Sequence, residues 1–258
     1  MNLSLEGKRA LVCGSTNGIG KACAQLMAAR GAVIVLAARN KKKLQTTLNE
    51  LAGAGHSYIC ADFDDPDDLK QKTTDHLAET GPVHILMNNT GGPHGGPLIE
   101  AKAEEFEIAF RRHVIANQFL AQAVVPGMKK LGYGRIINII STSVRQVIPG
   151  LGVSNTIRGA VAQWAKTLAL ELGPDGITIN NILPGYTNTD RLKELLEKWA
   201  DNAGVSYDEM VDSITNKTSM RRIGEPQEIA YAVAFLASAA ASYINGTDFS
   251  IDGGRFGA

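Results

Sequence analysis

The stretch Arg9-Ala-Leu-Val-Cys-Gly-Ser-Thr-Asn-Gly-Ile-Gly20 decides the fold, because an apolar strand pattern leads directly into three glycines and then a helical pattern to about Arg30. The first glycine permits a tight turn, the second lets the backbone approach a pyrophosphate, and the third lets helix pack closely on strand. Free amide groups at the helix N-terminus would bind the anion, although a helix cap or tight loop can also look like this. The stretch predicts a dinucleotide site made of Gly14, Ser15, Thr16, Asn17, Gly18, Ile19 and Gly20.

Short β-branched runs alternate with helical patterns along the whole chain. These runs lie near residues 9–13, 33–37, 57–61, 84–88, 134–140, 177–182 and 246–251. The run 33–37, and residues 136–140 of the run 134–140, are apolar on both faces, as in parallel strands that helices cover on each side. The alternation predicts repeated βαβ units with right-handed crossovers. We expect an α/β fold of the Rossmann type, a doubly wound parallel sheet of about seven strands with helices on both faces.

The length of 258 residues and the hydrophobic content of 44% suit a single domain over residues 1–258, and no repeat or linker divides the chain. One segment, residues 186–222, is polar and charged and contains helical fragments such as residues 191–198. It follows the carboxyl end of a predicted strand, and ligands bind outside such ends in doubly wound sheets. We expect this segment to be an insertion that forms a lid over the substrate.

Charge and cysteine content argue against several classes of protein. Lys plus Arg equals Asp plus Glu at 26 each, so the chain lacks the cationic field that nucleic acid or an anionic membrane would need. The three cysteines have no paired spacing, and residues 1–7 do not resemble a secretory signal. The most apolar stretch, residues 230–244, is shorter than the roughly 20 residues of a membrane span. We expect a reduced, cytoplasmic protein without a nucleic-acid, membrane or metal partner.

The end of the second predicted strand indicates which dinucleotide binds. An NAD site usually has an acidic residue about 20 positions after the glycines, where it holds the ribose 2′-hydroxyl. This chain has Arg39 there, followed by three lysines at 41–43. A guanidinium suits a 2′-phosphate, whereas the lysines are also consistent with an ordinary solvated helix start. We therefore expect NADP(H) rather than NAD(H), with Arg39 as the selective residue.

Further motifs follow the other predicted strands, namely Asp62 after the third, Asn88-Asn-Thr-Gly91 after the fourth and Pro184-Gly185 after the sixth. Together with the glycine turn and the C-terminal stretches 222–230 and 245–254, they make the chain resemble the short-chain dehydrogenase/reductase family over nearly its whole length. The likeness extends to its members similar to 3-oxoacyl-acyl-carrier-protein reductase. Relatives often form dimers or tetramers through the helices at 103–131 and 152–173, so the resemblance implies a homodimer or homotetramer.

The resemblance also implies roles in a cofactor site. Asp62 would contact the adenine, Asn89 would line the ribose pocket, and Thr187 and Thr189 would lie near the nicotinamide and pyrophosphate. Each residue has a simpler alternative: Asp62 could cap the helix after Pro66, Asn89 could serve a turn, and Thr189 could cap the helix that begins near Asp190. The same expected site includes Gly91, Pro184 and Gly185.

The catalytic positions depart from the family pattern. Members that transfer hydride use a serine, a tyrosine thirteen residues later, a lysine four beyond that, and an asparagine on the preceding long helix. Ser141 matches the serine, whereas Ser154, Arg158 and His113 stand at the tyrosine, lysine and asparagine positions. A serine hydroxyl is a far weaker acid than tyrosine, whose pKa is about 10, and arginine stays protonated and cannot pass a proton on. The usual proton relay should fail.

Three hypotheses follow. In the first, the chain is an NADP(H)-dependent oxidoreductase for an unidentified carbonyl or alcohol, in which His113 donates the proton, Ser141 assists, and Arg158 clamps a substrate anion. His113 could equally fill helix-packing space and hydrogen-bond a backbone carbonyl. In the second, the chain is a binding or regulatory module that holds NADP(H) without turnover, and in the third it is a structural partner of an active relative. The retained Ser141, the nicotinamide pocket and the long lid favour the oxidoreductase.

Overall fold

The computed structural model describes residues 3–256, and in these residues seven parallel strands form one sheet in the order β3-β2-β1-β4-β5-β6-β7. The strands are β1 (Arg9–Cys13), β2 (Val33–Ala38), β3 (Ser57–Cys60), β4 (Ile85–Asn88), β5 (Gly134–Ile139), β6 (Ile177–Pro184) and β7 (Asp248–Ile251). The strand order reverses between β1 and β4, and a crevice opens at such a point in a doubly wound sheet. The predicted fold class is confirmed, and each predicted run overlaps one strand.

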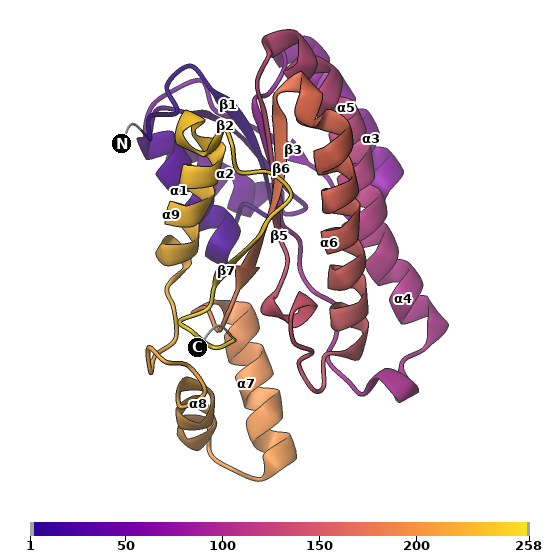
Figure 1. The fold of residues 1–258 in the computed structure, drawn as a ribbon, viewed down its shortest axis with the longest axis vertical. Coiled ribbons are helices and arrows are strands. Elements are labelled where there is room, and N and C mark those ends of the chain that lie inside the picture. The colour runs from indigo at the N-terminus through magenta and orange to yellow at the C-terminus, as the bar shows by residue number, and fades with distance from the viewer. Residues whose placement is uncertain (1–2, 257–258) are drawn as a thin grey trace.

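Helices cover both faces of the sheet (Figure 1). On one face lie α1 (Gly18–Ala29), α2 (Lys41–Asn49) and α9 (Pro226–Ala237); on the other lie α3 (Pro66–Thr80), α5 (Ala116–Leu131) and α6 (Gly152–Leu172). Because side chains alternate across a strand, Ala10 and Val12 of β1 pack on the α1 side, whereas Leu11 and Cys13 pack on the α5 side. Burial on both faces explains why these strands are apolar throughout.

A row of buried polar side chains crosses the sheet near its carboxyl edge. Asn88 donates to Asn138, Asn138 to Asn181, and Asn181 to Asp248, each over 2.9 Å between register partners on neighbouring strands. Lys166 of α6 closes the row with an ion pair of 2.8 Å to Asp248. Since buried amides need partners, this row fixes the relative register of β4 to β7.

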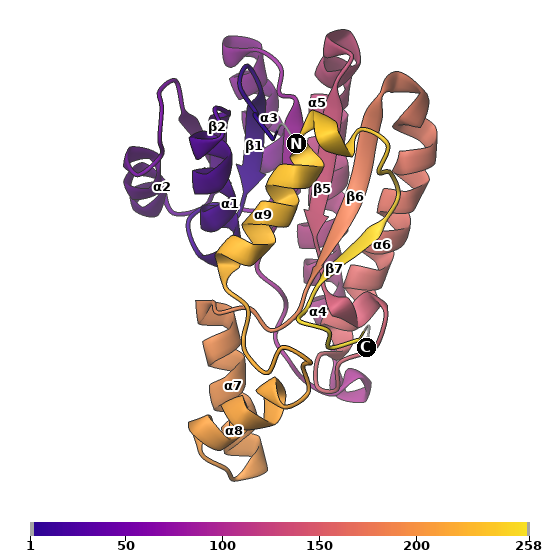
Figure 2. The ribbon, with the colours of Figure 1, turned by 60° about the vertical axis from the view of Figure 1, so that its left-hand side comes forward.

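Two helices, α7 (Asp190–Ala203) and α8 (Tyr207–Thr215), project beyond the carboxyl ends of the strands (Figures 1 and 2). Their apolar side chains form a small core of their own around Leu192, Leu196 and Ile214. This pair lies within the predicted segment 186–222, and its function as a lid stays a prediction. Another helix, α4 (Ala103–Phe110), precedes α5 on the opposite side of the molecule from α9.

Within residues 3–256 no helix combines the length and the apolar character that a membrane crossing requires.

Candidate cofactor and substrate site

A cavity of about 410 Å³ opens where the strand order reverses, at the carboxyl ends of the central strands. Its walls come from the glycine turn after β1, the loop after β4, the end of β5, the first turns of α6, the loop after β6 and the first turns of α7. These segments are far apart in sequence, and the parallel sheet brings them to one edge. Ligands of doubly wound folds bind at this edge.

The glycine turn forms a cradle that a larger side chain would fill. Gly14 has a φ of +58°, and a Cβ there would lie 2.5 Å from the carbonyl oxygen of Asn89. Gly18 has a φ of +49°, and its Cβ would lie 2.9 Å from Cγ2 of Thr189. At Gly20 a Cβ would lie 2.1 Å from the carbonyl oxygen of Gly14. All three positions therefore require glycine, in agreement with the roles predicted from their spacing.

The remaining residues of the turn divide between the cavity and its support. Asn17 and Ile19 line the cavity together with Gly14 and Gly18. Ser15 is buried, and its hydroxyl donates to the carbonyl of Ala37 over 3.4 Å. Thr16 is half-buried beside it and, among the described residues, is not part of the cavity wall.

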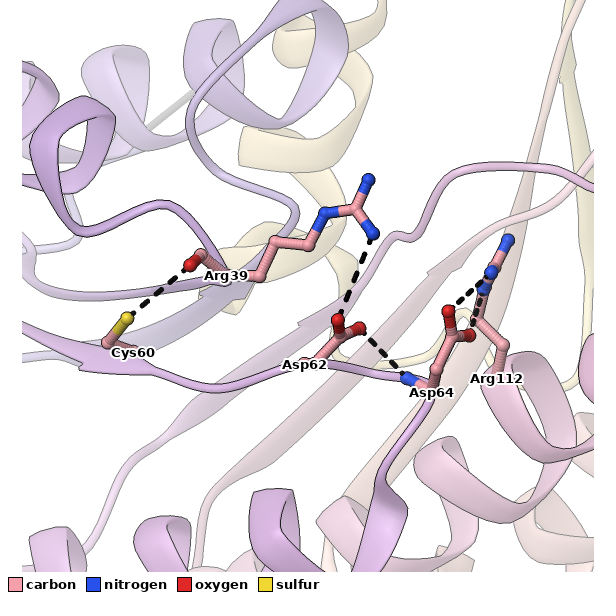
Figure 3. A network of polar contacts seen from close by, with 5 residues as sticks. All are labelled: Arg39, Cys60, Asp62, Asp64 and Arg112. Atoms are coloured by element: carbon pink, nitrogen blue, oxygen red, sulfur yellow. Dashed lines mark hydrogen bonds and ion pairs between the residues drawn. The ribbon is translucent and has the colours of Figure 1, made fainter.

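Arg39 and Asp62 lie side by side at the ends of β2 and β3 (Figure 3). Their closest nitrogen and oxygen are 3.8 Å apart, and the Arg39 side chain is 73% exposed, so the ion pair is weak. The Asp62 carboxylate also accepts a hydrogen bond from the backbone N–H of Asp64. The side-chain carboxylate of Asp64 in turn accepts from Arg112 over 2.6 Å. The alternative that Asp62 caps the following helix is wrong, because Asp65 caps α3.

The segments after β4 and β6 supply the other half of the expected cofactor site. Asn89 lines the cavity, and its amide donates to the carbonyls of Cys13 and Gly14, each over 3.4 Å, which ties the β4 loop to the glycine turn. Thr189 also lines the cavity and caps α7 by accepting from the N–H of Leu192 over 3.3 Å. Its predicted capping function is confirmed. The cavity wall also includes Gly91, Pro184, Gly185 and Thr187.

Three of the four candidate catalytic residues line the same cavity. Ser141 follows β5, and its hydroxyl accepts from the N–H of Ser143 over 3.0 Å. Ser154 lies in the first turn of α6, one turn before Arg158. The guanidinium of Arg158 reaches back to the carbonyl of Ile139 over 2.8 Å and is only 9% exposed.

The Arg158 guanidinium remains positively charged in this buried position. Burial, together with the nearby positive charge of Arg191, lowers its pKa to about 10. This pKa is still well above neutral pH. None of the ion pairs formed within the described chain involves Arg158.

His113 is set apart from the other three residues. It lies in a single π-helical turn (Arg111–Ile115) between α4 and α5, is 2% exposed, and is not among the described residues that line the cavity. Its Nδ1 lies 2.7 Å from the hydroxyl oxygen of Thr90, which does line the cavity. Burial, with the charges of Arg158 and Arg112, holds the pKa of His113 well below its usual 6.5. The imidazole is therefore neutral at neutral pH, and it reaches the cavity through Thr90.

Several cavity residues were not identified as functional from sequence. Arg191, in the first turn of α7, donates to the carbonyl of Pro93 over 2.6 Å, and Arg255 stacks on the ring of Tyr186 at 4.0 Å. Trp199 of α7 lines the cavity and contacts the ring of Tyr186, so it contributes both to the cavity wall and to the packing of α7. Arg191 lies in the first turn of the helix that follows the loop after β6, and this position was a usable signal. Nothing comparable marks Arg255.

Among residues 3–256 no three His, Cys, Asp or Glu side chains gather in an arrangement that could hold a metal ion.

Comparison with known proteins agrees with this geometry. A family model described as enoyl-(acyl carrier protein) reductase matches residues 14–255. The gluconate 5-dehydrogenase of Gluconobacter oxydans is 33% identical over 253 residues, which are 97% of this chain and 95% of that protein. The 3-oxoacyl-acyl-carrier-protein reductase of Vibrio cholerae is 33% identical over 256 residues, which are 98% of this chain and 99% of that protein.

A solved structure extends the likeness to three dimensions. The L-sorbose reductase of Gluconobacter frateurii, complexed with NADPH and L-sorbose, superposes with a TM-score of 0.93 at 29% identity, covering 100% of each chain. The match therefore includes the glycine turn, the strand ends that carry the cavity and the helices beyond them. On the sequence match over almost the full length, this chain belongs to the short-chain dehydrogenase/reductase family.

Proposed function

We propose that this chain is an NADP(H)-dependent oxidoreductase that interconverts a carbonyl compound and its alcohol by an atypical proton route. The observation that carries the proposal is the convergence of the glycine cradle, Asn89, Ser141, Ser154 and Arg158 on one cavity. Sequence relatives that are named as a dehydrogenase and a reductase, and the NADPH in the sorbose reductase complex, support it.

The residues at the carboxyl ends of the strands have the chemistry to hold NADP(H). The backbone amides at the start of α1 would hold the pyrophosphate, since glycines keep the approach open there. Arg39 would hold the 2′-phosphate, and Asp62 the adenine. Asn89, Gly91, Pro184, Gly185, Thr187 and Thr189 would surround the nicotinamide half. When bound, NADP(H) supplies or accepts the hydride.

The proton route runs through Thr90 to His113. In alcohol oxidation the hydride leaves carbon, the O–H proton passes to the Thr90 oxygen, and the Thr90 proton passes to Nδ1 of His113, which becomes an imidazolium. Reduction reverses these steps. The 2.7 Å contact between His113 and Thr90 supports this route, and Ser141 would donate a hydrogen bond to the substrate oxygen.

The low pKa of His113 gives this route a pH dependence. At neutral pH the neutral imidazole serves as the base for oxidation. Reduction needs the imidazolium, so its kcat should rise as the pH falls below 6.5.

Variants of the route test the proposal. Purified protein is assayed with NADPH against ketones, 3-oxoacyl thioesters, sugars and quinones. We expect H113A and Thr90→Val to abolish turnover, whereas S154A leaves it nearly unchanged. Retained activity in H113A would refute this proton route.

The alternative is an NADP(H)-binding or regulatory subunit without turnover, and the serine and arginine at the positions of the usual tyrosine and lysine favour it. Tight NADPH binding with no turnover of any compound would support it. The double variant S154Y/R158K restores the family residues. Activity that appears only in this variant would show that the natural chain lacks a competent acid.

We also propose a homodimer or homotetramer. A groove between α4 and α6 is lined by Phe106, Phe110 and Ile157, and Phe110 and Ile108 are 42% and 51% exposed. Apolar side chains left open to water in this way are typical of an interface. Light scattering on the purified protein gives the mass directly, and a monomer at micromolar concentration would contradict this part.

A further inference from the structure

We infer that the substrate carries a carboxylate beside an apolar group, and that Arg158 and Arg191 bind this carboxylate in the cavity. The inference rests on the proposed function for the reaction that follows binding. Carboxylate binding can be measured without turnover, so the chemical class of the substrate can be tested separately from the reaction.

Arg158 lacks a counter-charge within the described residues. A buried cation is costly unless an anion and hydrogen-bond acceptors surround it. Arg158 is only 9% exposed. One of its five N–H donors binds the carbonyl oxygen of Ile139, which carries no net charge. The charge that acts on it most strongly is another cation, Arg191. Within the described chain the guanidinium thus has no carboxylate to neutralise it, and a ligand can supply one.

Arg191 lies close to the same part of the cavity as Arg158. Its Nη2 donates to the carbonyl of Pro93 over 2.6 Å, in the loop after β4, and Nη2 of Arg158 lies 3.8 Å from the point where a Cβ on Gly92 would stand. Both guanidinium groups therefore lie against neighbouring residues of one loop, and both line the cavity. The Glu194 carboxylate is 3.8 Å from Arg191 and is largely exposed, so it neutralises little of this charge.

The cavity wall carries a net positive charge. Among the described residues, its charged side chains are Arg158, Arg191, Arg255 and one acid, Asp190. Asp190 accepts a hydrogen bond from Asn17, at the glycine turn. The field at the substrate end is therefore positive and favours an anion.

The remaining wall defines the rest of the ligand. Ile148, Leu151, Leu195 and Trp199 present apolar surface to the cavity. A polyhydroxylated neutral sugar would place hydroxyl groups against this apolar surface without hydrogen-bond partners. An oxo acid with an aryl or alkyl group would place its carboxylate at the arginines and its apolar group against this surface.

Benzoate and benzamide form a matched pair for the test, since they share shape and differ in charge. Each is titrated calorimetrically into NADP⁺-saturated protein. We expect benzoate to bind more tightly, and R158Q and R191Q each to weaken benzoate by about 10- to 100-fold without changing benzamide. R158K should retain part of the affinity because it keeps the charge. Lys193→Gln removes a cation from the exposed face of the same helix as Arg191 and should change nothing.

Equal affinity for benzoate and benzamide in the natural protein would overturn the inference. So would loss of NADP⁺ affinity in R158Q with benzoate unaffected, because Arg158 would then serve the cofactor. If R158Q fails to fold in a thermal melt, R191Q decides the matter, since Arg191 is half-exposed on α7.

Turnover distinguishes this inference from the proposed function. Benzoylformate and its methyl ester are offered with NADPH, and we expect the acid to be reduced in preference to the ester. No turnover of either compound, nor of any of the ketones, 3-oxoacyl thioesters, sugars and quinones, with benzoate binding dependent on Arg158, would refute the proposed function and support the carboxylate site. Preferential reduction of the ester would overturn the carboxylate site and support the proposed function.

Discussion

Replacing Arg39 with alanine should separate NADPH from NADH. The guanidinium lies at the end of β2, its side chain is 73% exposed, and its pairing with Asp62 is long at 3.8 Å. It can turn toward a 2′-phosphate without giving up a strong contact. NADH has a hydroxyl at that position, so the variant removes a charged contact from one cofactor and little from the other.

The magnitude follows from this exposure. A hydrogen bond to a charged group contributes about 1.5–3 kcal/mol, and solvent screening at an exposed site favours the lower part of that range. The Asp62 ion pair that must be released is worth about 0–1 kcal/mol. We therefore expect R39A to weaken NADPH by about 2- to 30-fold, and NADH by less than about twofold.

Fluorescence titration with NADPH and NADH measures both dissociation constants directly. Lys42→Ala is the matched control, because Lys42 is an exposed cation in the first turn of α2. We expect the NADPH effect of R39A to shrink as salt is raised, since the contact is exposed. An equal loss of both cofactors in R39A, or an equal effect of Lys42→Ala, would refute the 2′-phosphate assignment.

Three further predictions concern stability and the cradle. Gly20→Ala should lower both the melting temperature and NADPH affinity, since its Cβ would lie 2.1 Å from a backbone oxygen, whereas Gly159→Ala, with nothing within 4 Å, should do neither. Asn138→Ala should cost about 2–4 kcal/mol in urea unfolding, because it removes two buried hydrogen bonds and leaves both partners unpaired; a cost below about 1 kcal/mol would contradict the role given to the row. Because the pKa of His113 is lower in the folded chain than its usual 6.5, the unfolded chain binds more protons below that pH. Stability should therefore fall as the pH drops below 6.5, by up to about 1.4 kcal/mol per pH unit more than in H113N; parallel curves would contradict the burial of the imidazole.

The fold was predictable because its signals are local. The glycine spacing, the apolar runs and the helical periods each depend on neighbouring residues, and together they give the sheet. The polar row was missed because Asn138 was taken as part of a run apolar on both faces. Its partners Asn88 and Asn181 are 50 and 43 residues away and meet it only in the sheet.

The position of the predicted cofactor residues at one edge of the sheet followed from the sequence, whereas the surroundings of His113 and Arg158 did not. The predicted cofactor residues belong to short motifs that directly follow strands. The parallel sheet brings these motifs together at one edge. The π turn around His113 adds a bulge that helical periodicity does not reveal, so the sequence did not show that the imidazole faces Thr90. The approach of Arg191 to Arg158 joins two helices through tertiary packing, and no local pattern records it.

The central claim is that hydride transfer persists here without the usual tyrosine and lysine. The most direct measurement is deuterium transfer from NADPH labelled at C4 of the nicotinamide, followed by mass spectrometry of the product. We expect the natural protein to form an alcohol with deuterium on the former carbonyl carbon, and H113A to form none. If the protein binds NADPH tightly and no compound acquires deuterium, the chain is a binding module and not an oxidoreductase.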